Sequence, residues 1–352
     1  VSLSFSADRE PEIQKVVNRL GKMWDIQHKE IATAHIVYRH AIGDKGLNRI
    51  KSLTKEQIDS IVSQTDFSSP ESAFNELVEN LLILDRDFIL SKEVYCVVPV
   101  KYIEKTKISE RNREKDTLNL QFHTTLFDGT RMMLVSPFNK QVSVSVPKGG
   151  VGDPLGLLRI VPRSELLSNK FHYFVEGKNI KIESDEDGWF CRYLVDSETG
   201  LTIDYFSHHT QTESESKLIG RGRYQRCFSS VNSINFPRVA IQVEYKNYLP
   251  TLINIVYVEK MSFNISIPEQ VYQLALPKGM KIFEDIGTGH RSIFTDVQEP
   301  IDDISEVLLP TGTEKKRGSA LAFYIKRFCI FAGIVLLVIG LFLKIQQYLA
   351  KK

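Results

Sequence analysis

The sequence predicts an α+β protein, in which helices cover one face of a large antiparallel sheet and a transmembrane helix follows near the C-terminus. Short segments of strand composition, separated by turn residues, fill roughly 93–147 and 171–274. Helical periodicity precedes both regions, and 16 uncharged residues follow them, from Phe328 to Leu343. Many strands joined by short turns, with helices grouped outside them, are typical of one antiparallel sheet with helices on one face.

The first helix is expected from about Pro11 to His28, because proline suits a first helical turn and apolar residues recur at helical spacing. These apolar residues are Ile13, Val16, Val17, Leu20, Met23 and Trp24. A strand is expected at Thr33–Arg39. A second helical region spans about 53–90, where Thr54 and Gln57 fit a capping box and Ser69-Pro70 fits a helix start.

The two strand-rich regions are punctuated by turn signals, of which Asp128-Gly129 is the clearest hairpin. In the first region we expect strands at 94–100, 117–127, 131–136 and 141–147, with the charged run 101–116 as a loop or a strand extension. A short helix is expected at 155–169. Strands then follow at 171–176, 179–183, 189–195, 202–208, 217–229, 238–246 and 251–266.

The apolar run near the C-terminus predicts a helix that crosses a membrane. At 1.5 Å per residue it is about 24 Å long, and the flanking Lys326, Arg327 and Lys344 can reach the headgroups on either side. A core helix of a globular fold is the alternative, but it would rarely be apolar all round. The anchoring residues would be Phe328, Ile330, Phe331, Ile334, Val335, Leu336, Leu337, Val338, Ile339, Leu341, Phe342 and Leu343.

The chain is therefore expected to be a single-pass membrane protein with the lipid bilayer as a partner. Its parts would be a domain at 1–310, a polar tether at 311–321, the membrane helix at 322–344 and a basic tail at 345–352. Five basic residues before the helix against three after it favour a cytoplasmic domain. Export would override this bias, and the small, apolar residues Val1–Ala7 fit the end of a signal peptide or the start of a mature chain.

No motif in the sequence predicts catalysis, a metal or a cofactor, so we expect no enzyme. The net charge of +2 gives no field that would attract nucleic acid. Arg221, Arg223 and Arg226 with Tyr224 form a basic, aromatic cluster. One solvated strand face for Arg221 and Arg223 is favoured over a nucleic-acid or headgroup contact. His208 and His209 are adjacent, so on a strand they would point to opposite faces and share no metal.

The four cysteines include no CxxC pair, so neither a zinc ribbon nor a thioredoxin-type site is expected. Cys191 and Cys227 lie in the same strand-rich region. Buried free thiols are favoured for them, and a disulfide in an oxidising compartment is the alternative.

One phrase, Ile265–Asp285, resembles a known family. Its hydrophobic, proline and glycine positions are similar to the closing segment of LolA-like outer-membrane lipoprotein-sorting proteins, in particular the exported LolA-like proteins of planctomycete-type bacteria. The matching residues are Tyr272, Leu274, Pro277, Gly279, Ile282 and Asp285. Trp24 near the end of the leading helix and Phe236-Pro237 before a strand fit the same pattern, so the resemblance covers about 10–290.

The resemblance implies a curved sheet, a half-barrel, with helices over its concave face. It implies a periplasmic or extracytoplasmic domain that captures a hydrophobic ligand there, a lipid or the acyl chain of a lipoprotein. The helix at 155–169 would form the roof. The alternative is a protein-interaction or envelope-stress sensory module with a membrane protein as its partner. A membrane tether argues against a freely diffusing carrier.

Overall fold

The computed structural model describes residues 11–83, 89–98, 101–112, 117–147, 171–186, 188–211, 217–285 and 292–304. The chain divides into two compact units between Asp302 and Asp303. Every helix and strand described below belongs to the first unit. The tether, membrane helix and basic tail expected at 311–352 lie outside the described residues, as do the helix expected at 155–169 and the side chain of Trp24.

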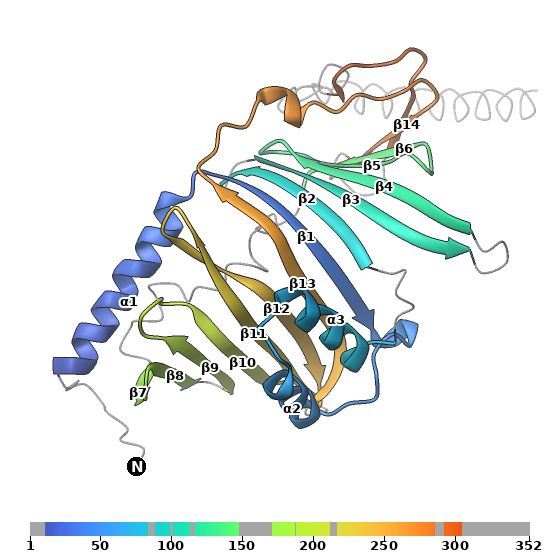
Figure 1. Ribbon diagram of the computed structural model, residues 1–352. Coiled ribbons are helices and arrows are strands. Elements are labelled where there is room, and N and C mark those ends of the chain that lie inside the picture. Colours follow the sequence, from blue (N-terminus) through green and yellow to red (C-terminus); the bar gives the residue numbers. More distant parts are fainter. Residues whose placement is uncertain are drawn as a thin grey trace, which may run out of the picture. The chain divides into compact units, whose positions relative to one another are not determined.

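Fifteen strands of the described residues form a single sheet, in the order β15-β14-β6-β5-β4-β3-β2-β1-β13-β12-β11-β10-β9-β8-β7 (Figure 1). Their bounds are β1 Thr33–Asp44, β2 Ile89–Val97, β3 Lys101–Asn112, β4 Thr117–Phe127, β5 Met132–Ser136, β6 Gln141–Ser145, β7 His172–Glu176, β8 Asn179–Glu186, β9 Trp189–Asp196, β10 Thr202–Gln211, β11 Lys217–Val231, β12 Ile234–Lys246, β13 Leu249–Phe263, β14 Lys281–Asp285 and β15 Ser292–Asp296. The central strand β1 lies between β2 and β13.

The sheet is mixed, which corrects the prediction of an antiparallel one. β14 runs parallel to β6, with Lys281 opposite Gln141 and Asp285 opposite Ser145. A hairpin forces its strands to be antiparallel, whereas a long connection leaves the direction free. β6 ends at Ser145 and β14 begins only at Lys281, so no hairpin fixes their relative direction.

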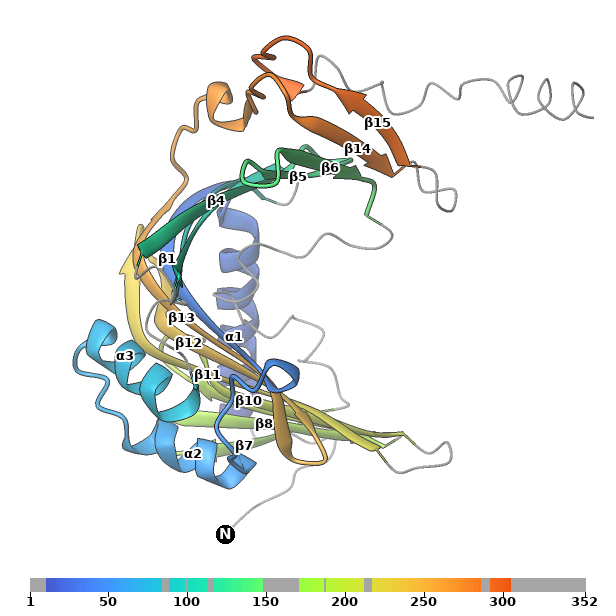
Figure 2. The same ribbon diagram turned by 90° about the vertical axis from the view of Figure 1, so that its right-hand side faces the viewer.

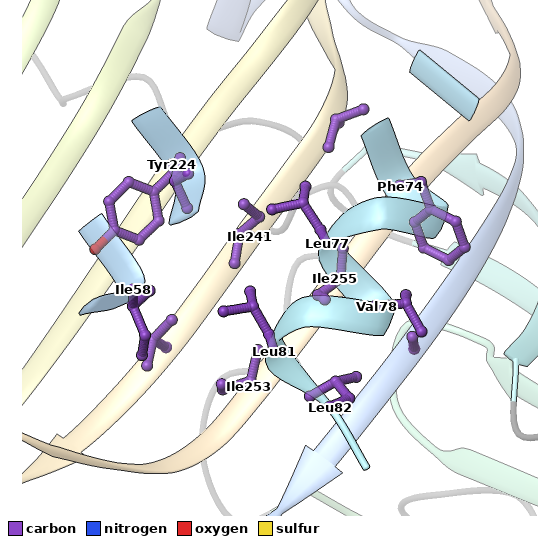
Figure 3. Packing of buried hydrophobic residues seen from close by; sticks show 14 of the residues in the cluster. Ile58, Phe74, Leu77, Val78, Leu81, Leu82, Tyr224, Ile241, Ile253 and Ile255 are labelled. Carbon is purple, nitrogen blue, oxygen red and sulfur yellow. The ribbon is translucent and has the colours of Figure 1, made fainter. Parts of the chain in front are cut away.

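Two helices pack on one face of the central strands, which we name the outer face. α2 (Lys55–Gln64) begins with the predicted capping box of Thr54 and Gln57, and α3 (Pro70–Leu81) begins at the predicted Ser69-Pro70. Their buried residues meet those of β11, β12 and β13 (Figure 3). The labelled members of this cluster are Ile58, Phe74, Leu77, Val78, Leu81, Leu82, Tyr224, Ile241, Ile253 and Ile255. Burying a side chain of this size stabilises the fold by about 1.5–3 kcal/mol.

The remaining long helix, α1 (Pro11–Glu30), packs on the opposite, inner face. Its Ile13, Val17 and Leu20 contact β7, β8 and β9, including Ile182. Ile182 pairs with Tyr193, Tyr193 with Tyr205, and Tyr205 with Arg223. These residues share one face of the sheet, and this face is opposite to the one on which α2 and α3 pack. Figure 2 shows the strands bending so that α1 lies inside the curve and α2 and α3 lie outside it. The prediction of helices over one face is therefore wrong.

The membrane helix predicted from the sequence has no counterpart in the described part of the chain. Among the helices that the structure describes, none has the length and apolar character needed to cross a membrane. The described residues therefore give no support to the expected single-pass membrane protein. The anchoring residues from Phe328 to Leu343 lie outside the described part of the chain.

The remaining elements refine the sequence prediction. The charged run after residue 100 is strand β3, so the alternative of a loop is wrong there. The phrase Ile265–Asp285 contains the 3-10 helix η4 (Glu269–Tyr272) and strand β14, and its Tyr272, Leu274 and Leu276 are buried. A second 3-10 helix, η1 (Lys45–Leu47), follows β1.

Candidate functional site

The register of the central strands decides which side chains share the inner face. Gln225 pairs with Ala240, Ala240 with Val256, and Val256 with His40. Directly opposed residues of neighbouring antiparallel strands project to the same side of a sheet. These four residues therefore form one row across β11, β12, β13 and β1, which we name the His40–Gln225 row.

An apolar cluster occupies the inner face on one side of this row. Apart from Ile31, which precedes β1, its members come from β1, β2, β12 and β13, and each has less than a tenth of its surface exposed. They are Ile31, Ala34, Ile36, Tyr38, Val94, Cys96, Ile234, Phe236, Ala240, Val256, Val258, Met261 and Phe263. We name this set the inner apolar cluster. Because it includes Ala240 and Val256, it extends into the His40–Gln225 row.

A charged network borders the inner apolar cluster on β1, β2 and β3. Glu104 accepts hydrogen bonds from Tyr38 Oη at 3.1 Å, Lys92 Nζ at 2.8 Å and Thr106 Oγ1 at 3.1 Å. Burial and the negative charge of Glu104 raise the pKa of Tyr38, so the phenol stays protonated. Both oxygens of Glu104 are thus engaged, and the Lys92 charge is compensated within the protein.

His40 presents an unused acceptor to the inner face. The side chain is 6% exposed, and its Nε2 lies 3.1 Å from Asn254 Oδ1. An amide oxygen only accepts, so Nε2 carries the hydrogen and Nδ1 keeps a free lone pair. Among the described residues Nδ1 has no partner. Burial, and then the charge of Lys92, lowers the pKa of His40 to about 4, so the imidazole is neutral at pH 7.

Gln225 is the least satisfied polar side chain of this face. It is 1% exposed, and within the described part of the chain neither its Oε1 nor its Nε2 has a hydrogen-bond partner. Leaving a buried polar group unpaired costs about 1–3 kcal/mol. Its neighbour in the row is Ala240, which contributes only a methyl group. Because the described residues supply no partner for the amide of Gln225, a water molecule or a ligand would satisfy it.

The next row toward the ends of the strands is polar. Arg223 pairs with Gln242, and Gln242 pairs with Asn254. The guanidinium carbon of Arg223 lies 6.0 Å from the centre of the Tyr205 ring, and Tyr205 in turn contacts Tyr193 at 4.7 Å between ring centres. Burial lowers the pKa of Arg223, and its buried Nε has no partner among the described residues.

A cavity of about 250 Å³ lies on the outer face, between α2 and strands β9, β10 and β11. Its charged groups neutralise one another: Lys55 Nζ lies 2.5 Å from Asp59 Oδ2, and Arg226 Nη1 donates to Asp204 Oδ1 at 2.7 Å. Tyr224 Oη donates to the other oxygen of Asp59. These pairs fasten α2 to the sheet, which makes this cavity the weaker candidate for a binding site.

The structure separates several residues that the sequence placed together. Arg221 and Arg223 lie on the inner face, whereas Tyr224 contacts Asp59 on the outer face and Arg226 contacts Asp204 there. The predicted basic cluster is thus divided between the two faces.

Cys191 and Cys227 are free thiols, so the disulfide alternative is corrected. Cys191 pairs with Ser207 on the inner face. Cys227 lies two strands away, packs against the outer cluster and donates to Phe67 O at 3.1 Å. Side chains on opposite faces of a sheet cannot bring their sulfur atoms to bonding distance.

Sequence reasoning missed His40, Gln225 and Glu104. The available signal is a polar residue at an alternate position of a strand whose other inward residues are apolar, as with His40 after Ile36. Alternation assigns such residues to a face but cannot decide which face is buried. It also cannot show that Gln225 and His40 share one row, because their strands are neighbours only in the folded sheet.

The chain was compared with known proteins. No protein-family model and no curated protein matches it. Among solved structures, it is similar to the crystal structure of the LolA superfamily protein NE2245 from Nitrosomonas europaea, with a TM-score of 0.38 and 7% sequence identity over 73% of this chain and 97% of that chain. Similarity at this level assigns neither a family nor a function, so the LolA-like resemblance of the sequence stays a proposal.

Proposed function

We propose that the protein binds an amphipathic ligand, a lipid or the acyl chain of a lipoprotein, on the inner face of its sheet. The observation that carries this proposal is the amide of Gln225, which is buried beside the inner apolar cluster and has no hydrogen-bond partner among the described residues. An apolar tail would contact the cluster, and a polar group of the ligand would hydrogen-bond to Gln225. The LolA-like phrase at Ile265–Asp285 favours the same class of ligand.

The energetics favour a ligand that combines both properties. Each buried methylene contributes about 0.8 kcal/mol, so a tail of a few carbons gives useful affinity. A purely apolar ligand would leave the Gln225 amide and the His40 Nδ1 unpaired. A purely polar ligand would gain nothing from contact with the inner apolar cluster.

The experiment is mass spectrometry of the organic extract of the purified full chain. The account predicts an acyl-bearing molecule in near-stoichiometric amount. Gln225→Leu, which keeps the volume but removes both polar atoms, should lower its occupancy. Ala240→Leu, which places a larger side chain in the His40–Gln225 row, should also lower the occupancy of the acyl-bearing molecule. The control is Leu134→Ala, at a side chain that is 44% exposed on β5. An extract without acyl chains, or equal occupancy in all variants, would contradict the proposal.

A second candidate, contact with a protein partner, is favoured by one observation. Trp189 and Ile219 both pair with His209, and Leu249 lies in the same row through Lys246. The exposed fractions are 52% for Trp189, 52% for Ile219 and 44% for Leu249, which is unusual for apolar side chains in one row. A photoreactive residue at position 189 should then cross-link one defined protein in cells, and the same residue at Leu134 should not.

A further inference from the structure

Two arginines of β11 lie on the inner face in contrasting states. Arg221 Nη2 donates to Glu244 Oε1 at 3.1 Å, across the pair of strands β11 and β12. Arg223, two residues further along the same strand, has no ion pair in the described residues, although its side chain is partly buried. The inner face thus holds one guanidinium with a carboxylate ion pair and, within the described residues, one without.

Three cations of the inner face, Lys92, Arg221 and Arg223, differ in their partners. Lys92 is paired with Glu104, and Arg221 with Glu244, which uses both carboxylates that the register places near these cations. An arginine keeps its charge at any physiological pH. Arg223 is partly buried, the charge of Glu244 acts on it, and within the described residues no carboxylate forms an ion pair with it, so its guanidinium can accept an anion.

Arg223 also lies at the boundary between the exposed and the buried parts of the inner face. Successive rows advance by two residues, about 7 Å along a strand. Ile219 belongs to the exposed row of Trp189. The next two rows along β11 contain Arg221 and then Arg223. Gln225 follows in the most buried row, beside Ala240 of the inner apolar cluster. A ligand with its tail on the cluster would place its headgroup near Arg223.

We propose that the ligand of the inner face carries an anionic headgroup, a phosphate or a carboxylate, which Arg223 binds while Gln225 hydrogen-bonds to the adjoining polar group. This inference rests on the proposed function and names the class of its ligand. The guanidinium can offer Nε and one Nη to two oxygens of the same anion, a geometry that suits phosphates and carboxylates. Contact with the Tyr205 ring would hold the guanidinium toward the ligand.

The test uses three soluble probes and the full chain: dihexanoyl-phosphatidylglycerol, dihexanoylglycerol without phosphate, and glycerol 3-phosphate without acyl chains. Calorimetry should show the phosphatidylglycerol bound most tightly. Arg223→Gln should weaken its binding about 10–100-fold, the usual value of a hydrogen bond to a charged group, and should leave dihexanoylglycerol binding unchanged. Arg223→Lys, which keeps the charge, should bind phosphatidylglycerol more tightly than Arg223→Gln does.

Arg221→Gln is the matched control, because Arg221 lies on the same strand and face but already has Glu244 as its partner. It should change phosphatidylglycerol affinity less than threefold. Equal binding of phosphatidylglycerol and dihexanoylglycerol, or an equal loss in the Arg221 and Arg223 variants, would overturn the headgroup inference alone. Equally tight binding of glycerol 3-phosphate would show that the ligand is a free anion and not a lipid. If neither acylated probe binds, the proposed function itself fails.

Discussion

His40 and Gln225 stand at the two ends of one cross-strand row, separated by only Ala240 and Val256. Both end residues are more than nine-tenths buried, and both carry polar atoms without partners in the described residues. Buried polar groups are ordinarily hydrogen-bonded. The polar atoms at the two ends of this row, which lack partners in the described residues, instead fit a place where a ligand binds.

The pH dependence of stability tests the environment of His40. Burial lowers its pKa to about 4, whereas an unfolded histidine titrates near 6.5. Between these values the unfolded chain binds more protons, so the free energy of unfolding should fall as the pH drops from about 6.5 to 4, by on the order of 2–3 kcal/mol. Urea denaturation at several pH values measures this slope, and His40→Asn should flatten it. An equal slope in both proteins would show that His40 is not held neutral.

The Glu104 network should be important for stability. Glu104→Gln would leave Lys92, whose side chain is 16% exposed, without its counter-charge, and we expect a loss of about 1–3 kcal/mol in the free energy of unfolding. Glu244→Gln is the control, because the Arg221–Glu244 pair is more exposed, at 47% and 38%. It should cost less than about 1 kcal/mol. Equal losses in the two variants would contradict the buried character of the network.

A substitution at Gly43 of β1 tests how closely this strand packs against the segment that follows α3. A Cβ at this position would lie 3.0 Å from Arg49 O and would overlap with Leu82 Cδ2. Gly43→Ala should therefore lower the free energy of unfolding by about 1–3 kcal/mol. Leu82→Ala removes the overlapping methyl group, so the double variant should lose less than the sum of the two single losses. Strict additivity in chemical denaturation would show that Gly43 and Leu82 are not in contact.

Much of the fold could be predicted from local sequence signals. Proline at residue 11, the capping box at Thr54 and Gln57, and Ser69-Pro70 locate three helices because caps are determined within a few residues. Most strands of the central sheet were predicted from alternation and turns. The parallel pairing of β14 with β6 was not, because no short-range signal fixes the direction of strands that far apart in the sequence.

The candidate site could not be predicted from the sequence, for a related reason. Arg221, Arg223 and Arg226 look alike in sequence, yet they differ in their ion pairs. Arg221 pairs with Glu244 and Arg226 with Asp204, whereas Arg223 has no ion-pair partner among the described residues. Cross-strand register decides between these outcomes. Cys227 has a positive φ of 56°, although the register with β12 is the same on both sides of it, with Arg226 opposite Val239 and Phe228 opposite Pro237. Sequence reasoning had no means to predict this backbone conformation.

The most direct test of ligand binding on the inner face is photo-crosslinking of the full chain with a palmitic acid that carries a diazirine in its chain, followed by peptide mapping. The account predicts saturable labelling of Ile234–Lys246 and Leu249–Phe263, the strands that supply Ala240 and Val256, and competition by unlabelled palmitic acid. Labelling that does not saturate, or that falls mainly on α2 around Lys55 and Asp59, would contradict it.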